Sequence, residues 1–188
     1  MPELETERLR LRRWRAEDRE PFARMNDDAA VMEFFPARLT RAESDALVDR
    51  IETHFAEHGF GLWAAELRAE GSFIGYIGLA APRFEAHFTP CVEIGWRLAR
   101  THWGKGLATE GARAVVRYAF EELGLEELVS FTAPANVHSR RVMEKLGMVH
   151  DAREDFDHPL LPEGHWLRRH VLYRVRRDVW QARAGEMF

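Results

Sequence analysis

Residues 102–110, which read HWGKGLATE, decide the fold of this chain. They follow an apolar run at residues 92–98 (VEIGWRL) that is typical of a strand, and they open a run with helical spacing. A glycine turn between a strand and a helix leaves backbone N–H groups free at the amino end of the helix, where they can hold a phosphate group. The sequence therefore predicts a phosphate-binding turn at residues 102–110.

The rest of the chain alternates between strand-like and helix-like segments. Thr40 and Glu43 form a capping box before one helix, and residues 68–72 read as a hairpin turn. Residues 151–164 are polar, contain two prolines and predict a mobile loop. This order indicates an α/β fold with a mixed sheet, helices on both faces and one domain spanning residues 1–188. We expect strands at residues 6–14, 60–67, 73–79, 91–98, 128–132 and 166–175, and helices at residues 16–25, 41–58, 105–123 and 137–146.

Composition limits the class of protein. Among the 188 residues, 46% are hydrophobic and 31% are charged, which is typical of a soluble globular chain. No run reaches the roughly 18 apolar residues of a membrane-spanning helix, and the charged first residues lack an apolar segment. We therefore expect a cytoplasmic protein with no membrane partner. Cys91 is the only cysteine, so no internal disulfide forms and a small core residue is expected there.

The strongest basic run, RLRLRRWR, begins at Arg8. Alternation places Leu9 and Leu11 on one face of a strand and Arg8, Arg10 and Arg12 on the other, which predicts a solvated outer face. Nucleic-acid binding is the alternative function for this run. The formal net charge of −4 argues against it, so we expect no nucleic-acid partner.

Two familiar phosphate motifs do not fit the turn. The dinucleotide fingerprint G-x-G-x-x-G needs a third glycine where this chain has Thr109, and the Walker A pattern G-x-x-x-x-G-K-[ST] is absent. Dinucleotide and ATP binding are therefore disfavoured.

A second motif, NVHSRRVMEKLGM at residues 136–148, follows a predicted strand. Together with residues 102–110 it resembles the GNAT superfamily of acyl-CoA-dependent N-acetyltransferases, and the resemblance is sharp over residues 91–148. Within that superfamily, residues 103–110 are most similar to the group that acetylates the N-termini of ribosomal proteins. The resemblance implies the GNAT fold, with a mostly antiparallel sheet, helices on both faces and a splayed acyl-CoA-binding cleft.

The superfamily's phosphate loop reads [Q/R]-x-x-G-x-[G/A]. Gly106 and Ala108 match its last two positions, whereas Trp103 stands where Gln or Arg is usual, a departure common in the ribosomal-protein group. The resemblance implies that backbone amides hold the pyrophosphate of CoA, and Lys105 adds an ionic contact unless it is simply solvated. These amides belong to Trp103, Gly104, Lys105, Gly106, Leu107 and Ala108.

The resemblance also implies contacts with the pantetheine arm of CoA. The backbone groups of Trp96 and Leu98 would pair with it like an added strand, while their side chains pack in the core. Asn136 would contact the same arm; its alternative role is a plain helix cap, and one residue can do both.

Two residues are candidates for acid–base chemistry. Glu93 lies in an otherwise apolar strand, where partial burial would raise its pKa, and we predict that it is the general base, directly or through water. A structural ion pair with an arginine is the alternative. Relatives often have a tyrosine acid where this chain has Met143, so Ser139 becomes the nearest candidate to hydrogen-bond the sulfur, or else a plain first-turn serine.

These features predict an acyltransferase that moves an acetyl group directly from acetyl-CoA, as co-substrate, to a primary amine. The acceptor is a protein N-terminus or a small amine, and a backbone N–H near Trp96 would stabilise the oxyanion. No metal is expected, since His54 and His58 lack a third ligand nearby. The alternative is a non-catalytic acyl-CoA-binding protein of the same fold. Relatives are often dimers, so a homodimer is expected.

Overall fold

The computed structural model describes residues 2–185, and side chains within the last helix up to residue 182. The chain forms two compact units, which are described separately below. One comprises Met1–Ala80 and Gly95–Val115, and the other comprises Ala81–Ile94 and Val116–Phe188.

The first unit is built on an antiparallel sheet. Neighbouring strands follow one another along the chain, with Leu9 opposite Leu67 and Leu62 opposite Gly78. The hairpin turn predicted at residues 68–72 is confirmed, because Gly71 N donates to Leu67 O. The strands are β1 (Leu4–Glu5), β2 (Leu9–Arg12), β3 (Leu62–Leu67) and β4 (Ser72–Ala80), followed by the later residues of β5 (Glu93–Leu98).

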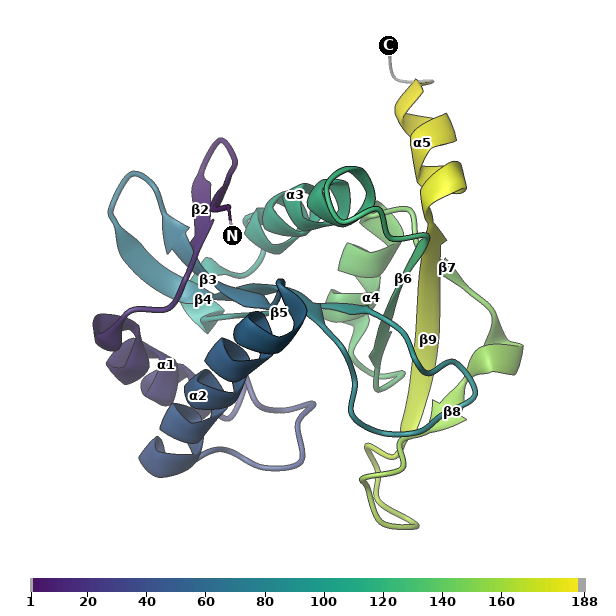
Figure 1. The fold of residues 1–188 in the computed structure, drawn as a ribbon. Coiled ribbons are helices and arrows are strands. Elements are labelled where there is room, and N and C mark those ends of the chain that lie inside the picture. Colours follow the sequence, from purple (N-terminus) through teal and green to yellow (C-terminus); the bar gives the residue numbers. More distant parts are fainter. Residues whose placement is uncertain (1, 186–188) are drawn as a thin grey trace. The chain divides into compact units, whose positions relative to one another are not determined.

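Helices cover both faces of this sheet, as predicted. Figure 1 shows α1 and α2 on one side of β3 and β4, and α3 on the other. Phe22, Val48 and Tyr76 pack together on the first side. On the second side Gly111 of α3 lies so close to β4 that an added Cβ would be 2.4 Å from Ile77 Cδ1. The helices are η1 (Ala16–Asp18), α1 (Arg19–Asn26), α2 (Arg41–His58), η2 (Arg100–His102) and α3 (Leu107–Glu121).

The cap of α2 shows how local sequence sets these boundaries. Thr40 Oγ1 accepts a hydrogen bond from Glu43 N, and the Glu43 carboxylate accepts one from Thr40 N, so the predicted capping box is confirmed. Gly59 ends the helix with a φ of 74°, a conformation that favours glycine.

The second unit contains the parallel pair in the sheet. Glu93 of β5 lies opposite Val129 of β6 in parallel register, whereas β9 pairs antiparallel with β6, and β7 and β8 pair antiparallel with β9. The predicted mixed, mostly antiparallel sheet is thus confirmed. Its elements are β6 (Glu127–Thr132), α4 (Val137–Lys145), β7 (Val149–His150), η3 (Ala152–Glu154), β8 (Phe156–Asp157), β9 (Arg169–Arg176) and α5 (Arg177–Gly185).

Two sequence predictions need correction in the second unit. Residues 151–164, expected to be loop throughout, contain η3 and β8, because β8 completes hydrogen bonds along β9 through the pair Phe156–His170. The strand expected from residue 166 begins at Arg169, and Trp166 is exposed. No helix within residues 2–185 is long and apolar enough to cross a membrane.

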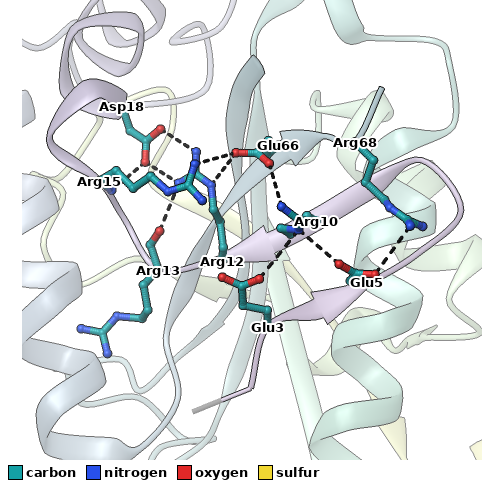
Figure 2. A network of polar contacts seen from close by, with 9 residues as sticks. All are labelled: Glu3, Glu5, Arg10, Arg12, Arg13, Arg15, Asp18, Glu66 and Arg68. Carbon is teal, nitrogen blue, oxygen red and sulfur yellow. Dashed lines mark hydrogen bonds and ion pairs between the residues drawn. The ribbon is translucent and has the colours of Figure 1, made fainter. Parts of the chain in front are cut away.

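The basic run that begins at Arg8 also departs from its prediction. Leu9 and Leu11 are buried as expected, but Arg12 is only 2% exposed instead of solvated. Figure 2 shows the reason: Arg12 donates to Asp18 at 2.6 and 2.9 Å and to Glu66 at 2.7 Å. Two carboxylates neutralise the buried guanidinium, which makes its burial tolerable.

The neighbouring arginines have acidic partners as well. Arg10 pairs with Glu3, Glu5 and Glu66, Arg13 with Glu52, and Arg15 with Glu66. The run is therefore a network of ion pairs and not an open basic face; Figure 2 shows the pairs of Arg10 and Arg12.

Candidate active site

The predicted phosphate turn lies in the first unit, between η2 and α3. Gly104 has a φ of 72° and Gly106 a φ of 79°, both in the left-handed region that favours glycine. The helix begins directly afterwards at Leu107, and Glu110 N makes the first helical hydrogen bond, to Gly106 O. The glycines are therefore needed to turn the chain into α3.

The backbone amides from Gly104 to Ala108 have no acceptor among the described residues. Within residues 2–185, none of the N–H groups from Gly104 to Ala108 donates a hydrogen bond to another protein group. They lie at the positive end of a 15-residue helix. Such a set of free amides can bind an anionic group such as a phosphate.

Residues from the amino-terminal segment fix the turn in place. Arg8 Nη1 donates to Lys105 O at 3.0 Å, and Arg8 Nε donates to Glu110 Oε2 at 2.6 Å. Thr6 Oγ1 and Arg8 N donate to Glu110 Oε1. Burial disfavours the charged carboxylate, but these hydrogen bonds outweigh it and lower the pKa of Glu110. The sequence did not predict that Arg8 and Glu110 fix the turn, because these two residues are about a hundred positions apart in the chain.

Trp103 and Leu98 contact each other within the first unit. Trp103 Nε1 donates to Leu98 O at 2.7 Å, while the indole is 40% exposed beside the turn. One of the two lone pairs of Leu98 O is therefore already used. Trp96 is half-buried and the Lys105 side chain is exposed. Pantetheine contacts at Trp96 and Leu98, and phosphate contact at Lys105, stay predictions.

Glu93, the predicted base, lies in the second unit at the start of β5. Its side chain is half-buried, and within the described residues its carboxylate forms no hydrogen bond or ion pair. Arg174, on the same face of the sheet, is bound to Glu127 at 2.6 Å and Glu154 at 2.8 Å. The structural ion pair is therefore absent among these residues. Burial without a partner raises the pKa of Glu93 to about 8.

Asn136 and Ser139 lie at the amino end of α4 in the second unit. Asn136 Oδ1 accepts from Ser139 N at 3.2 Å, and its Nδ2 donates to Thr132 Oγ1 at 3.0 Å. The predicted helix cap is thus confirmed. The Ser139 hydroxyl makes no hydrogen bond to other described residues. Met143, which stands at the usual tyrosine position, is 1% exposed within the core.

Glu93 and the Asn136 cap are attached to different faces of the β5–β6 pair. Glu93 lies opposite Val129 and therefore shares its face, whereas Thr132, which binds Asn136, lies three residues further along β6 on the other face. The other predicted site residues are Trp96, Leu98 and residues 103–108. They all belong to the first unit, in which residues 95–115 are one continuous stretch of chain.

Other candidates from the sequence are structural. His54 Nδ1 contacts Phe60 O at 2.9 Å, and residues 2–185 contain no group of three His, Cys, Asp or Glu side chains suited to a metal. Burial, with a smaller effect of Glu93, raises the pKa of Cys91 to about 11, so its thiol stays protonated.

Comparison with known proteins agrees with this geometry. The family described as an acetyltransferase (GNAT) domain matches residues 8–149. A relative from Aspergillus fumigatus, FsC-acetyl coenzyme A-N(2)-transacetylase, is 35% identical over 192 residues, covering 95% of this chain and 78% of the relative.

Solved structures share the fold. An acetyltransferase (GNAT family) from Bacillus anthracis superposes with a TM-score of 0.78 at 26% identity, covering 94% of this chain and 99% of the other. The ribosomal-protein-S5-alanine acetyltransferase from Vibrio fischeri, a neighbour from the group suspected from the sequence, has a TM-score of 0.73 at 19% identity. The match covers 96% of this chain and 99% of the Vibrio fischeri chain. The expected fold is thereby confirmed.

Proposed function

This chain belongs to the GNAT acetyltransferase family, and from that premise we propose that it transfers an acetyl group from acetyl-CoA directly to a primary amine. Membership of the family and the names of its relatives support an acyltransferase. The observation that carries the proposed donor is the set of free amides from Gly104 to Ala108 at the positive end of α3. The name of the Aspergillus fumigatus relative, with acetyl coenzyme A and N(2), supports the same donor and an amine acceptor.

The residues present suit the diphosphate and the thioester arm of acetyl-CoA. The backbone amides of Gly104, Lys105, Gly106, Leu107 and Ala108 would hold the diphosphate. The Trp103 amide, expected from the sequence to join them, instead donates to Arg100 O at 3.1 Å. Trp96, Leu98 and Asn136 would hold the pantetheine arm. Bound in this way, the co-substrate supplies an acetyl group already activated as a thioester.

Glu93 would remove the proton that an ammonium acceptor must lose before its nitrogen can attack. A carboxylate with a pKa of about 8 is matched to an α-amino group, whose pKa is about 8 as well. The new bond forms between the amine nitrogen and the carbonyl carbon, and the carbon–sulfur bond breaks. Ser139 would hydrogen-bond the departing sulfur. CoA leaves as the free thiol once the sulfur has taken up the second proton, which the nitrogen loses on becoming an amide.

Measurement of CoA release tests the proposal. Wild type should release CoA when acetyl-CoA is mixed with an accepted amine, in a panel of N-terminal peptides, amino acids, polyamines and aminoglycosides. Glu93→Gln should lower kcat by about 10²- to 10⁴-fold, the usual contribution of a general base. Glu121→Gln, an exposed carboxylate on α3, is the matched control and should leave kcat unchanged. An unchanged kcat in Glu93→Gln would refute the role of Glu93.

A non-catalytic acyl-CoA-binding protein is the second candidate. It is favoured by one observation, the buried Met143 at the position where relatives carry a tyrosine acid. That protein would bind acetyl-CoA without releasing CoA for any amine. The cytoplasmic setting, the single domain and a homodimer stay predictions from the sequence.

A further inference from the structure

Arg97 is a buried arginine on β5 in the first unit. It is 8% exposed, and its Nη1 donates to Asn26 Oδ1 at 2.6 Å. Asn26 is in turn fixed by its own hydrogen bond from Nδ2 to Ser44 Oγ at 2.9 Å, and both partners are fully buried. The guanidinium is therefore held in a defined orientation by α1 and α2.

No carboxylate of the described residues neutralises this charge. Within residues 2–185, Arg97 forms no ion pair, its buried Nε has no hydrogen-bond acceptor, and its Nη2 donates to no protein group. The remaining contacts are with aromatic rings: the guanidinium lies 3.8 Å from the ring centre of Phe35 and 5.3 Å from that of Tyr76.

Arg12 provides the contrast within the same unit. It is also buried, but Asp18 and Glu66 accept three hydrogen bonds from it. A buried cation without an anionic partner costs free energy, because it has lost its water without gaining a counter-charge. Among the described residues, Arg97 is thus the buried arginine whose charge has no anionic partner.

The unused donors have the geometry of a carboxylate site. Nε–H and Nη2–H point to the same side of a guanidinium and together form the parallel pair that binds a carboxylate through both oxygens. Asn26 occupies Nη1 only, so it leaves this pair unoccupied.

An anion at Arg97 would be distinct from the phosphate at the turn. Tyr76, which contacts Arg97, packs with Phe22 and Val48 on the face covered by α1 and α2. The phosphate turn begins α3, which packs on the opposite face through Gly111 and Ile77. Once acetyl-CoA occupies the turn, the other ligand of the reaction is the acceptor.

We propose that Arg97 binds a carboxylate of the acceptor, so that the preferred substrates are primary amines that carry a carboxylate. This inference rests on the proposed function. Nε is buried, and the half-buried Phe35 of residues 27–39 lies on the guanidinium, so the proposal requires this segment to move when the acceptor binds.

A binding test uses a probe that needs no turnover. Titration of ¹⁵N-labelled wild type with phenylacetate should shift the Nε–Hε resonance of Arg97, identified by its loss in Arg97→Gln. Phenylacetamide, which lacks the charge, should leave it in place. The Arg12 resonance is the internal control, because Glu66 already occupies its Nε. An Arg97 resonance that phenylacetate does not move would overturn the proposal.

A kinetic test compares phenylalanine with phenylalaninamide as acceptors. Arg97→Gln should raise KM about 10- to 100-fold for the acid, in line with the loss of a charge-assisted hydrogen-bonded pair, and less than about twofold for the amide. Arg97→Lys should recover part of the affinity, and the exposed Arg50→Gln is the control. An equal effect on both acceptors, as expected of a purely structural arginine, would overturn the assignment. A wild type that releases no CoA with any amine would instead refute the proposed function, while the resonance test would still decide the anion site.

Discussion

Arg8 donates a hydrogen bond of 3.0 Å from its guanidinium to the backbone carbonyl of Lys105, and so fixes the middle of the phosphate turn. The same guanidinium forms an ion pair of 2.6 Å with Glu110 in the first turn of α3. A side chain from the start of the chain thus determines the position of amides about a hundred residues later.

Arg8→Gln should weaken CoA binding about 5- to 20-fold, because the turn loses its anchor and the site loses a nearby positive charge. Calorimetric titration with CoA measures the effect. Arg13→Gln is the matched control: Arg13 is 46% exposed against 45% for Arg8, and it pairs with Glu52. Equal affinities in wild type and Arg8→Gln would contradict the anchoring role.

Gly106→Ala should raise the KM for acetyl-CoA at least about tenfold. An alanine is strained at a φ of 79°, and the resulting shift misaligns the amides that hold the diphosphate. Gly71→Ala, at a φ of 65° in the β3–β4 hairpin, is the control. Both variants should lose about 1 kcal/mol of stability, and only the first should lose affinity. A similar KM for the two variants would show that the turn does not bind the donor.

Arg12→Gln should lower the free energy of unfolding by about 3–5 kcal/mol, because Asp18 and Glu66 would remain buried without their cation. Urea denaturation measures the change. Arg10→Gln, which removes a half-exposed arginine from the same network, should cost less than about 1 kcal/mol. Comparable losses of unfolding free energy in the two variants would contradict a special contribution of the buried Arg12 to stability.

The pH dependence of stability follows from the raised pKa of Glu93. The unfolded chain ionises this group near its ordinary value of 4.5, whereas the folded chain holds the proton up to about pH 8. Between these values the unfolded state binds fewer protons, so stability falls as pH rises. Glu93→Gln should therefore be more stable than wild type by about 1–3 kcal/mol at pH 9, and the difference should vanish near pH 4. Parallel stability–pH curves for the two proteins would contradict the assignment.

The activity of wild type should depend on pH through the same group. Glu93 accepts a proton only when ionised, so its titration should lower kcat/KM about tenfold per pH unit below pH 8, in addition to the titration of the amine. In Glu93→Gln only the titration of the amine itself should remain. Rates of CoA release across pH 6–10 would show one titration fewer in the variant, and identical profiles would exclude Glu93 as the base.

Parts of the fold could be predicted from the sequence because they depend on interactions between neighbouring residues. The capping box at Thr40, the cap at Asn136 and the glycines of the phosphate turn each act on residues a few positions away. Their structural consequences could therefore be predicted. The two-residue strands β1, β7 and β8 could not, since their partner strands define them and two residues carry no periodicity.

The burial of charged residues in the strands was also difficult to predict from sequence. Alternation alone placed Arg12 in solvent, because its partner Glu66 lies 54 residues away and enters only through the pairing of β2 with β3. The apolar surroundings of Glu93 did signal partial burial, which the structure confirms. The burial of Arg97 depends on Asn26, 71 residues away, and could not be read from the strand itself.

Mass spectrometry of the acceptor tests the central claim most directly. Wild type is incubated with acetyl-CoA carrying a labelled acetyl group and with each amine of the panel, and both products are quantified. The account predicts one labelled acetyl group on the amine for every CoA released, with both products lost together in Glu93→Gln. Binding of acetyl-CoA without a labelled amine in any class of acceptor would contradict it.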